Sequence, residues 1–382
     1  MSQDVIILWY RNDLRIHDHQ PLYKALKVNA QIIPIYCLDP RQFSQTHFGF
    51  PKTGVFRAKF LLESIIDLGK NLQKLGSNLV IFQDKPEIVI PRVAQKLSAT
   101  SVFFHHEVTT EEVKVERFVY QALKQIGVKL KSFWGHTLYH PDDLPFEIQE
   151  LPELFTNFRK DVENNSTVNP TFSIPKKLPS LPKIDVGILP KLSDLNLEIS
   201  APYARGVLEF KGGETAGLER VKNYFWQKDC LKIYKETRNG MLGANYSSKL
   251  LGINWQMGAE WFESLLIDYD VCSNWGNWNY TAGVGNDGRG FRYFNIPKQA
   301  KDYDPEGKYV KYWLPELRKV PAAKVHEPWK LLPVEQNRFG VKIGVDYPQP
   351  IVNLSQSVKK NEKIYNSGLQ MTGGKRKARS KL

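Results

Sequence analysis

The residues with the clearest chemical potential lie close together in the second half of the chain. Asp268, Asp270 and Asn274 fall within seven residues of one another. The tryptophans near them in the sequence are Trp255, Trp261, Trp275 and Trp278. Carboxylates in so apolar a stretch need hydrogen-bond donors when they are buried, and a ligand ring with several N–H and O–H groups would supply them. The pattern favours a ligand site, although tryptophans at helical spacing are also typical of a protein core.

A second polar set has the chemistry to bind phosphate. Ser247 and Ser248 stand directly before Lys249, and Tyr234 lies upstream. Small hydroxyl groups beside a lysine suit a diphosphate, because they supply hydrogen bonds and a compact positive charge. The pattern is common in proteins, so on its own it permits a diphosphate site and does not establish one.

A third polar set, Arg-Asn-Asp-Leu-Arg at residues 11–15, follows the first apolar run of the chain. No glycine-rich loop follows this run, so the dinucleotide-binding fingerprint is missing from the position where it belongs. Such a charged cluster serves either as a ligand site or as a structural ion-pair network. The sequence leaves both possibilities open.

Alternating strands and helices must position residues 11–15 within the first third of the chain. Apolar runs predict five β-strands, at residues 5–9, 31–38, 78–82, 101–106 and 130–134. Apolar positions at helical spacing predict helices between them, most clearly at 56–75 and 110–126. Continuous Val/Ile/Leu runs that alternate with amphipathic helices indicate a doubly wound α/β fold, with a five-stranded parallel sheet covered on both faces. In such a sheet, ligands bind beyond the carboxyl ends of the strands.

The remainder of the chain predicts a different organisation. Residues 136–210 are rich in proline and carry little periodicity, so we expect a connector that runs over the surface between two domains. A helical pattern begins at Thr215, within a helical region that we expect over 211–350. Residues 351–382 form a basic tail, with eight Lys and Arg from position 359 onward against a single acidic residue. We expect this tail to be disordered.

Composition narrows the class of protein. The chain has 382 residues, of which 42% are hydrophobic and 24% charged, as is typical of a folded protein with two domains. The net charge is +13, but more than half of the excess lies in the tail, so charge alone does not establish nucleic-acid binding. Three scattered cysteines exclude a disulfide framework and a CxxC metal site. Without a membrane-spanning run or a signal-peptide pattern, we expect a cytoplasmic protein.

Through these residues and their order, the chain resembles the photolyase/cryptochrome family, specifically its cryptochrome DASH branch. The similar segments are residues 9–18, 234–240, 246–249, 268–285, 291–297 and 313–317. The resemblance implies a photolyase-type α/β antenna domain over residues 1–135 and an all-α FAD-binding domain over 211–350. It also implies a monomeric blue-light flavoprotein. Such a protein passes an electron from light-excited FAD to cyclobutane pyrimidine dimers in DNA, especially single-stranded DNA.

The resemblance assigns roles in FAD binding to individual residues. Asp268 and Asp270 would contact the isoalloxazine and ribityl side of FAD, and Asn274 would face flavin N5. The residues that would hold the diphosphate, or lie beside it, are Tyr234, Ser247, Ser248 and Lys249. The protein binds and tunes the cofactor, whereas the cofactor supplies the chemistry.

The resemblance also assigns residues to electron transfer and to light harvesting. Trp278 and Trp255 would be the first two members of a chain of tryptophans that conducts electrons. Glu107, which ends the fourth predicted strand, would bind an antenna pterin, 5,10-methenyltetrahydrofolate. No residue is assigned to a metal.

The sequence departs from the family pattern in one large way. Residues 247–250 continue directly into 251–255, a segment that lies much further along in the family. A block of about a hundred residues, most of a small domain, is therefore missing near the 250/251 junction. The block would carry the helix at the DNA lesion, a helix beside the flavin and the third tryptophan. We expect weak or absent FAD binding, slow photoreduction and no detectable dimer repair.

Two other hypotheses stay open at the level of sequence. One is a non-enzymatic remnant, in which an intact α/β domain that still binds a pterin is attached to a collapsed helical region. The other is a DNA-binding module that acts through the basic residues at 375–381. An absorbance spectrum separates the remnant from a flavoprotein, because bound oxidised flavin is yellow.

Overall fold

The computed structural model describes residues 4–152, 154–199, 210–228, 253–283, 291, 293 and 295–379. These residues divide into two compact units. The first unit contains the described residues up to 199 together with 210–228 and 260–274. The second contains 253–259 and the described residues from 275 onward. Both units receive residues from α8 (Trp255–Leu265) and α9 (Val271–Ala282).

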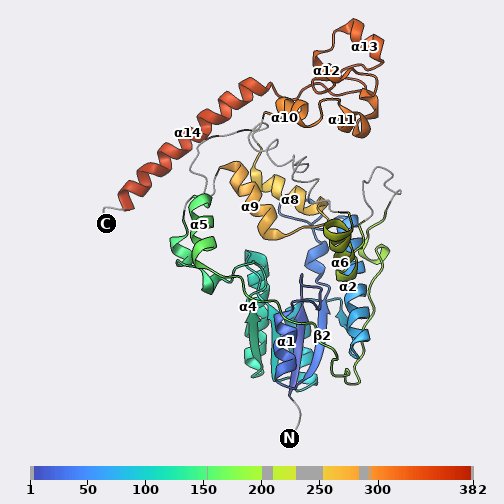
Figure 1. Cartoon of the computed structure of the whole chain (residues 1–382), viewed down its shortest axis with the longest axis vertical. Helices are drawn as coiled ribbons and strands as arrows, with labels where there is room; N and C mark the ends of the chain where they lie inside the picture. Colours follow the sequence, from blue (N-terminus) through green and yellow to red (C-terminus); the bar gives the residue numbers. More distant parts are fainter. Residues whose placement is uncertain are drawn as a thin grey trace. The chain divides into compact units, whose positions relative to one another are not determined.

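The first unit is built on a parallel sheet of five strands (Figure 1). The strands are β1 (Val5–Tyr10), β2 (Gln31–Cys37), β3 (Val80–Phe82), β4 (Ser101–His105) and β5 (Lys129–Phe133). Their order across the sheet is β3-β2-β1-β4-β5. The chain therefore moves outward from β1 to β3, returns to the other side of β1 and continues to β5. The predicted five-stranded parallel sheet is confirmed, with each strand ending within two residues of its predicted bounds.

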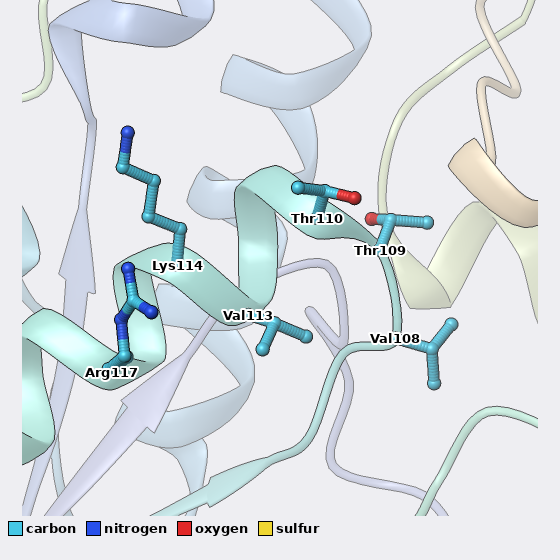
Figure 2. Close-up of a pocket in the computed structure, with 6 residues that line it drawn as sticks. All are labelled: Val108, Thr109, Thr110, Val113, Lys114 and Arg117. Carbon is cyan, nitrogen blue, oxygen red and sulfur yellow. The ribbon is translucent and has the colours of Figure 1, made fainter.

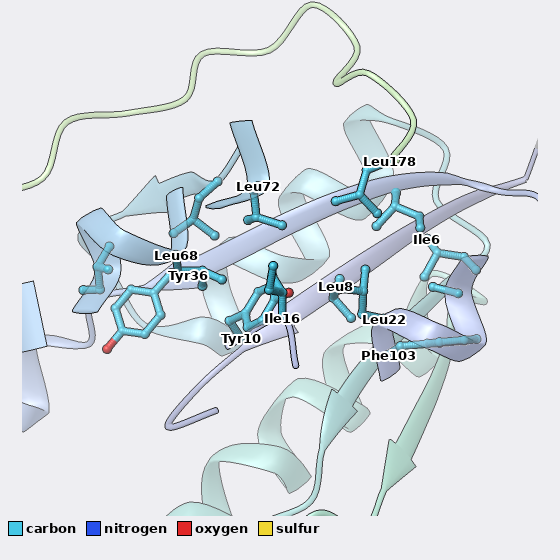
Figure 3. Packing of buried hydrophobic residues seen from close by; sticks show 14 of the residues in the cluster. Ile6, Leu8, Tyr10, Ile16, Leu22, Tyr36, Leu68, Leu72, Phe103 and Leu178 are labelled. Carbon is cyan, nitrogen blue, oxygen red and sulfur yellow. The ribbon is translucent and has the colours of Figure 1, made fainter. Parts of the chain in front are cut away.

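Helices cover both faces of the sheet, because successive side chains of each strand point to opposite faces. The helices are α1 (Gln20–Lys27), α2 (Val55–Lys74), α3 (Pro86–Lys96) and α4 (Thr110–Gln125). From β1, Ile6 and Leu8 pack against α1 and α2 (Figure 3). Ile7 and Trp9 pack on the other face, against α3 and α4. Each large apolar side chain buried in these clusters contributes roughly 1.5–3 kcal/mol to folding.

Part of the proline-rich connector packs on this sheet. Leu178 is buried in the cluster that contains α1 and α2, and Leu181 and Ile184 lie against the opposite cluster. The backbone N–H of Ile81 donates to the carbonyl of Val186 at 2.8 Å. The connector also contains one helix, α5 (Phe155–Asn165). It therefore contributes to the core of the first unit, and a domain boundary near residue 135 stays a prediction.

Two carboxylates of α2 hold the start of α6 (Glu214–Lys222), which is followed by a π-helical turn (Asn223–Gln227). Asp67 Oδ2 accepts from the N–H of Thr215 at 3.0 Å, and Glu63 Oε2 accepts from the N–H of Gly212 at 2.8 Å. The first N–H groups of a helix have no partner within the helix, so Asp67 satisfies one of them, while Glu63 fixes the chain just before the helix. The helix that the sequence predicts from Thr215 is confirmed.

The second unit is helical, as the sequence predicts. Its further helices are α10 (Ile296–Tyr303), α11 (Lys308–Trp313), α12 (Ala322–Val325), α13 (Pro333–Phe339) and α14 (Leu354–Arg379). A small core joins α12 to the loops around it, and it consists of Leu317, Val320, Val325, Leu331 and Val341. Within the ranges that the structure describes, no helix combines the length and the apolar character needed to cross a membrane.

Helix α14 occupies most of the tail for which the sequence predicts disorder. This segment contains no proline after Pro350, so nothing in its backbone prevents a helix. One side chain also anchors it: Tyr365 donates a hydrogen bond to the carbonyl of Gly283 at 3.3 Å, and its ring lies 5.6 Å from that of Phe291. Helices are predicted from apolar residues at helical spacing, and this segment has only a weak pattern of that kind. A contact made by a single side chain, such as Tyr365, leaves no such pattern in the sequence.

Candidate functional site

Polar side chains gather where β1 and β4 end. The two strands are neighbours, with Trp9 opposite Phe104, although β2 and β3 lie between them in the sequence. The order of the strands reverses here, and open α/β sheets bind ligands at such a point. Residues 11–13 follow β1, and residues 105–107 close β4, so the topology brings both polar segments together.

Asp13 is the centre of a buried hydrogen-bond network. Its Oδ2 accepts from His19 Nε2 at 2.7 Å and from His105 Nδ1 at 2.6 Å. Its Oδ1 accepts from the backbone N–H of Arg11 at 2.7 Å. Burial alone would raise the pKa of Asp13, but the hydrogen bonds from the two histidines outweigh burial and hold that pKa well below its usual value. Asp13 is therefore ionised at neutral pH.

Asp13, His19 and His105 are also metal-ligand types, with one ligand atom of each within 4.8 Å of the others. The hydrogen bonds favour a different role. His19 Nδ1 accepts from the N–H of Leu22 at 3.1 Å, so the ring proton of the neutral imidazole lies on Nε2 and points at Asp13. Burial lowers the pKa of His19 and so keeps it neutral. A metal on Nε2 would displace this proton while Nδ1 is already occupied, so we assign the three residues a structural role.

Glu116 of α4 organises a second network beside the first. Its carboxylate forms an ion pair with Arg11 and lies 2.6 Å from His106 Nδ1. It also accepts the backbone N–H of Glu107 at 2.8 Å. Arg11 and Asp13 thus both serve to fix the loops at the ends of β1 and β4. Of the two roles that the sequence leaves open for residues 11–15, these contacts support the structural ion-pair network.

Glu107 is held at this edge with its carboxyl group in a distinct environment. Its side chain is 6% exposed, and its Oε1 accepts from Asn12 Nδ2 at 3.0 Å. Burial raises the pKa of Glu107, although the charge of Arg11 and the hydrogen bond from Asn12 oppose that change. Such a carboxyl group can exchange hydrogen bonds and a proton with the N–H groups of a ligand. The predicted antenna role of Glu107 stays a prediction.

Residues at the start of α9 lie near Glu107. Burial raises the pKa of Cys272 to about 11, and the charges of Asp270 and Glu107 add to the effect. Asp270 also lies 3.8 Å from His136 Nε2, and the ring of Trp134 lies 6.3 Å from that of His136. The thiol of Cys272 is therefore protonated at neutral pH and unsuited to nucleophilic chemistry. The surrounding acid, imidazole and indole groups are suited to bind a polar ring.

The two predicted flavin-contacting aspartates lie on the turn before α9. Asp268 is exposed. Asp270 is half-exposed, its Oδ1 accepts from the N–H of Ser273 at 2.6 Å, and its carbonyl accepts from the N–H of Asn274 at 2.9 Å. Asp270 is thus an N-cap of α9 that retains a solvent-accessible carboxylate. Asn274 is buried, at 6% exposure.

The predicted electron-transfer tryptophans lie on α8 and α9. The indole of Trp278 is buried against Gly258, where a Cβ atom would lie only 2.4 Å from the ring. The glycine therefore allows the indole to approach the backbone of α8. The ring of Trp255 lies 5.8 Å from that of Trp275, at an interplanar angle of 80°. Trp275, to which the sequence assigns no role in electron transfer, is thus in contact with a residue of the predicted chain.

A shallow cavity of about 420 Å³ lies beside the start of α4 (Figure 2). It is lined by Val108, Thr109, Thr110, Val113, Lys114 and Arg117. Figure 2 shows Val108 on the loop that precedes α4 and the two basic side chains on the helix. None of the predicted site residues lines this cavity, so it gives no support to a flavin or pterin site.

Several assignments fall outside the described residues. These are the predicted diphosphate residues Tyr234, Ser247, Ser248 and Lys249. Conversely, sequence reasoning missed His136 beside Glu107 and Arg57 beside Tyr269, and it did not connect Asn12 with Glu107. Arg57 is far from position 269 in the sequence, and no spacing rule connects them. The strand order could have pointed to Asn12, because it places the end of β1 next to the end of β4.

Two family models match the chain. One is described as DNA photolyase and matches residues 6–182, and the other is described as the FAD binding domain of DNA photolyase and matches residues 234–367. The first match covers the α/β sheet and much of the connector. The second includes both aspartates that are predicted to contact flavin, and the tryptophans of α8 and α9.

Proteins of known name and structure are similar over nearly the whole chain. A cryptochrome DASH of Gloeobacter violaceus is 47% identical, with 99% of both chains covered. A cryptochrome DASH of Synechocystis is 41% identical over 95% of this chain and 98% of its own. The crystal structure of a Synechocystis cryptochrome covers 95% of this chain and 100% of its own, with 40% identity and a TM-score of 0.90.

The length of one alignment supports the missing block. The alignment to the Gloeobacter violaceus protein extends over 493 positions, whereas this chain has 382 residues. More than a hundred positions of the alignment therefore contain no residue of this chain. Both ends of the two proteins are nevertheless covered, so the gaps are internal. With family models over both halves and relatives above 40% identity, the chain belongs to the photolyase/cryptochrome family.

Proposed function

We propose that this chain is a blue-light flavoprotein of the cryptochrome DASH type, which binds FAD with lower affinity than its longer relatives. The observation that carries the proposal is the turn before α9. It lies in the segment that matches the FAD binding domain, and it presents the carboxylates of Asp268 and Asp270 to solvent. The alternatives of a remnant without flavin or a tail-based DNA-binding module are not favoured, because relatives cover both units of the chain.

The polar groups at this turn fit the chemistry of FAD. Carboxylates accept hydrogen bonds, and the isoalloxazine and ribityl groups supply N–H and O–H donors. Asp268 and Asp270 would bind these donors, and Asn274, on the first turns of α9, would face flavin N5. We further propose that Ser247, Ser248 and Lys249 bind the diphosphate, with Tyr234 beside them. When bound, FAD would supply light absorption and electron transfer.

Trp278 and Trp255 would connect the flavin to the remainder of the protein by electron transfer. The tight packing of Trp278 on Gly258 fixes the position of one indole, and the contact with Trp275 fixes that of the other. Fixed donors suit electron transfer because little reorganisation is needed. Trp275, through its contact with Trp255, is a further candidate member of this chain.

Glu107 is proposed as a ligand of the folate antenna, 5,10-methenyltetrahydrofolate. Its carboxyl group could pair with the N–H groups of a pterin, and Asn12 holds it in place. His136, Cys272 and Asp270 add polar surface nearby.

The substrate would be single-stranded DNA with a cyclobutane pyrimidine dimer, since extrusion of a base is least costly where it is already unpaired. We propose a cytoplasmic monomer.

The test is the absorbance spectrum of the purified chain, before and after incubation with FAD. Oxidised flavin that remains bound after gel filtration, and that is lost in an Asp268→Asn/Asp270→Asn variant, is the expected result. The matched control is Asp302→Asn/Asp304→Asn, which alters a pair with the same spacing on the second unit. A colourless protein that takes up no FAD at any concentration would instead identify the chain as a remnant.

A further inference from the structure

The turn that presents Asp268 and Asp270 is attached to the first unit through the residue between them, Tyr269. The guanidinium of Arg57, on α2, lies 4.7 Å from the centre of the Tyr269 ring. The hydroxyl of Tyr269 donates a hydrogen bond to the carboxylate of Glu263, on α8. The two aspartates that face solvent therefore depend on a tyrosine that contacts two other elements of the unit.

Arg57 is held so that the face of its guanidinium is fixed. Its Nη2 donates to Thr53 Oγ1 at 2.5 Å and also to the carbonyl of Lys52. Its Nη1 is buried and has no hydrogen-bond partner among the described residues. The loop before α2 thus holds Nη2, and the guanidinium lies over the Tyr269 ring, a contact that a lysine could not reproduce.

The end of α8 is fixed to the same loop by independent contacts. A Cβ atom at Gly54 would lie 2.3 Å from the carbonyl oxygen of Ser264, so α2 begins in close contact with α8. Glu260 Oε2 accepts from the N–H of Phe48 at 3.0 Å, and the rings of Phe50 and Trp261 lie 5.2 Å apart. Glu263 is therefore held at a set distance from Arg57, and Tyr269 lies in contact with both.

Glu263 is surrounded by charges from three elements. Burial raises its pKa to about 7, while Lys52 from the loop before α2 and Arg57 from α2 oppose the change. Glu111 from α4 raises it further, and the hydrogen bond from Tyr269 lowers it. Near neutral pH the carboxyl group therefore gains or loses a proton. The deprotonated form accepts the Tyr269 hydroxyl in a charge-assisted hydrogen bond, which is stronger than the bond to the protonated form.

We propose that Arg57, Tyr269 and Glu263 are positioning residues that hold the turn at 268–270 in the arrangement that accepts FAD, and that Glu263 makes this arrangement pH-dependent. The inference rests on the proposed binding of FAD at this turn. None of the three residues needs to touch the flavin. They act by fixing the backbone at Tyr269, and this backbone positions Asp268 and Asp270 on either side of it.

The first measurement is the dissociation constant of FAD, from quenching of flavin fluorescence, at pH 6, 7 and 8. We expect the affinity of the wild-type chain to rise with pH, as Glu263 loses its proton. Glu263→Gln should remove the pH dependence. Tyr269→Phe should weaken binding at pH 8 by about tenfold, the equivalent of one hydrogen bond, and flatten the profile. The control is Tyr23→Phe on α1. It removes the hydroxyl of another tyrosine whose ring lies near a cation, since Lys27 is 5.2 Å from the Tyr23 ring.

The second measurement uses the chain without FAD and follows hydrogen exchange at the amides of Ser273 and Asn274, which bond to Asp270. Tyr269→Phe and Arg57→Lys should accelerate exchange. The control is Arg117→Lys, which alters another arginine near an aromatic ring, 5.9 Å from Phe118, and should leave exchange unchanged. Unchanged exchange, or a pH profile unaltered in Tyr269→Phe, overturns the positioning role. If the wild-type chain binds no FAD, the proposed function fails, and the exchange result then decides only whether Arg57 and Tyr269 hold the turn.

Discussion

At the scale of single residues, two buried carboxyl groups of the first unit respond to burial in opposite ways. Asp13 and Glu263 are 8% and 6% exposed. Asp13 accepts hydrogen bonds from two imidazoles, and its pKa falls well below its usual value. Glu263 accepts one hydrogen bond, from Tyr269, and burial outweighs this bond and the charges of Lys52 and Arg57, so its pKa rises to about 7. Direct donors, more than the degree of burial, decide which form is present.

Glu263→Gln is expected to change the pH dependence of stability. The pKa of Glu263 rises from 4.5 to about 7 on folding. The stability that comes from its protonated form is therefore complete below pH 4.5 and is lost as the pH rises through 7. At pH 8 the glutamine variant should be more stable than the wild type, by up to about 3 kcal/mol. Urea denaturation at pH 5 to 8 measures the difference.

The matched control is Glu219→Gln, at an exposed position on α6. Its denaturation midpoint should follow that of the wild type at every pH. Parallel curves for wild type and Glu263→Gln would show that Glu263 stays ionised in the folded chain. The same result would remove the source of pH dependence that we propose for FAD binding.

At the scale of elements, the packing of α8 and α9 in the second unit depends on one glycine. Gly258→Ala would place a Cβ atom 2.4 Å from the ring of Trp278, so the indole or the helix must move. We expect a loss of about 1–3 kcal/mol and a shift of the tryptophan fluorescence maximum to longer wavelength. Gly276→Ala is the control, because a Cβ atom on this residue of α9 meets nothing within 4 Å. An equal loss in both variants would contradict the contact.

The sequence predicts the elements of the first unit well because local pattern determines them. Strands rich in Ile, Val and Leu and amphipathic helices such as α2 need no distant information. The order of the strands, which brings residue 12 beside residue 107, depends on how the chain returns across the sheet. The tail shows the converse case: α14 has a weak apolar pattern, and a contact such as that of Tyr365 with Gly283 cannot be derived from spacing.

The candidate site could be predicted only in part for the same reason. Asp268, Asp270 and Trp278 belong to one short segment whose composition draws attention. Arg57 and Glu263 are ordinary residues on amphipathic helices, and only the folded chain places them around Tyr269. Signals that depend on composition were therefore visible in the sequence. Signals that depend on contacts between distant segments were not.

At the scale of the whole molecule, the connector affects how much of the chain is needed for a stable α/β unit. Leu178 is 3% exposed in the core beside α2, and Val186 bonds to β3. We expect the fragment 1–199 to be more stable than the fragment 1–135, because the shorter one would expose this part of the core. Urea denaturation of the two fragments, monitored by circular dichroism, tests this. Equal midpoints would support a domain that ends near residue 135.

The missing block leads to an expectation about photochemistry. The block would include the tryptophan that exchanges electrons with solvent and the residues that orient the DNA lesion. After loading with FAD, we expect blue light and thiol to reduce the flavin more slowly than in a full-length cryptochrome DASH. A dimer-bearing oligonucleotide should show no repair, since orientation of the substrate contributes much of the rate in such reactions. Repair at the rate of the longer relative would show that the block is dispensable.

The strand order also has a consequence for synthesis of the chain on the ribosome. β1 pairs with β2 early, at Val5 with Gln31, but its other edge pairs with β4, where Ile6 meets Ser101. Until about a hundred residues have been translated, this edge of the most central strand has no partner, and its unpaired backbone groups can template contacts with other nascent chains. A pause in translation just after β3 would prolong that interval, so the yield of soluble protein should depend on codon choice between β3 and β4.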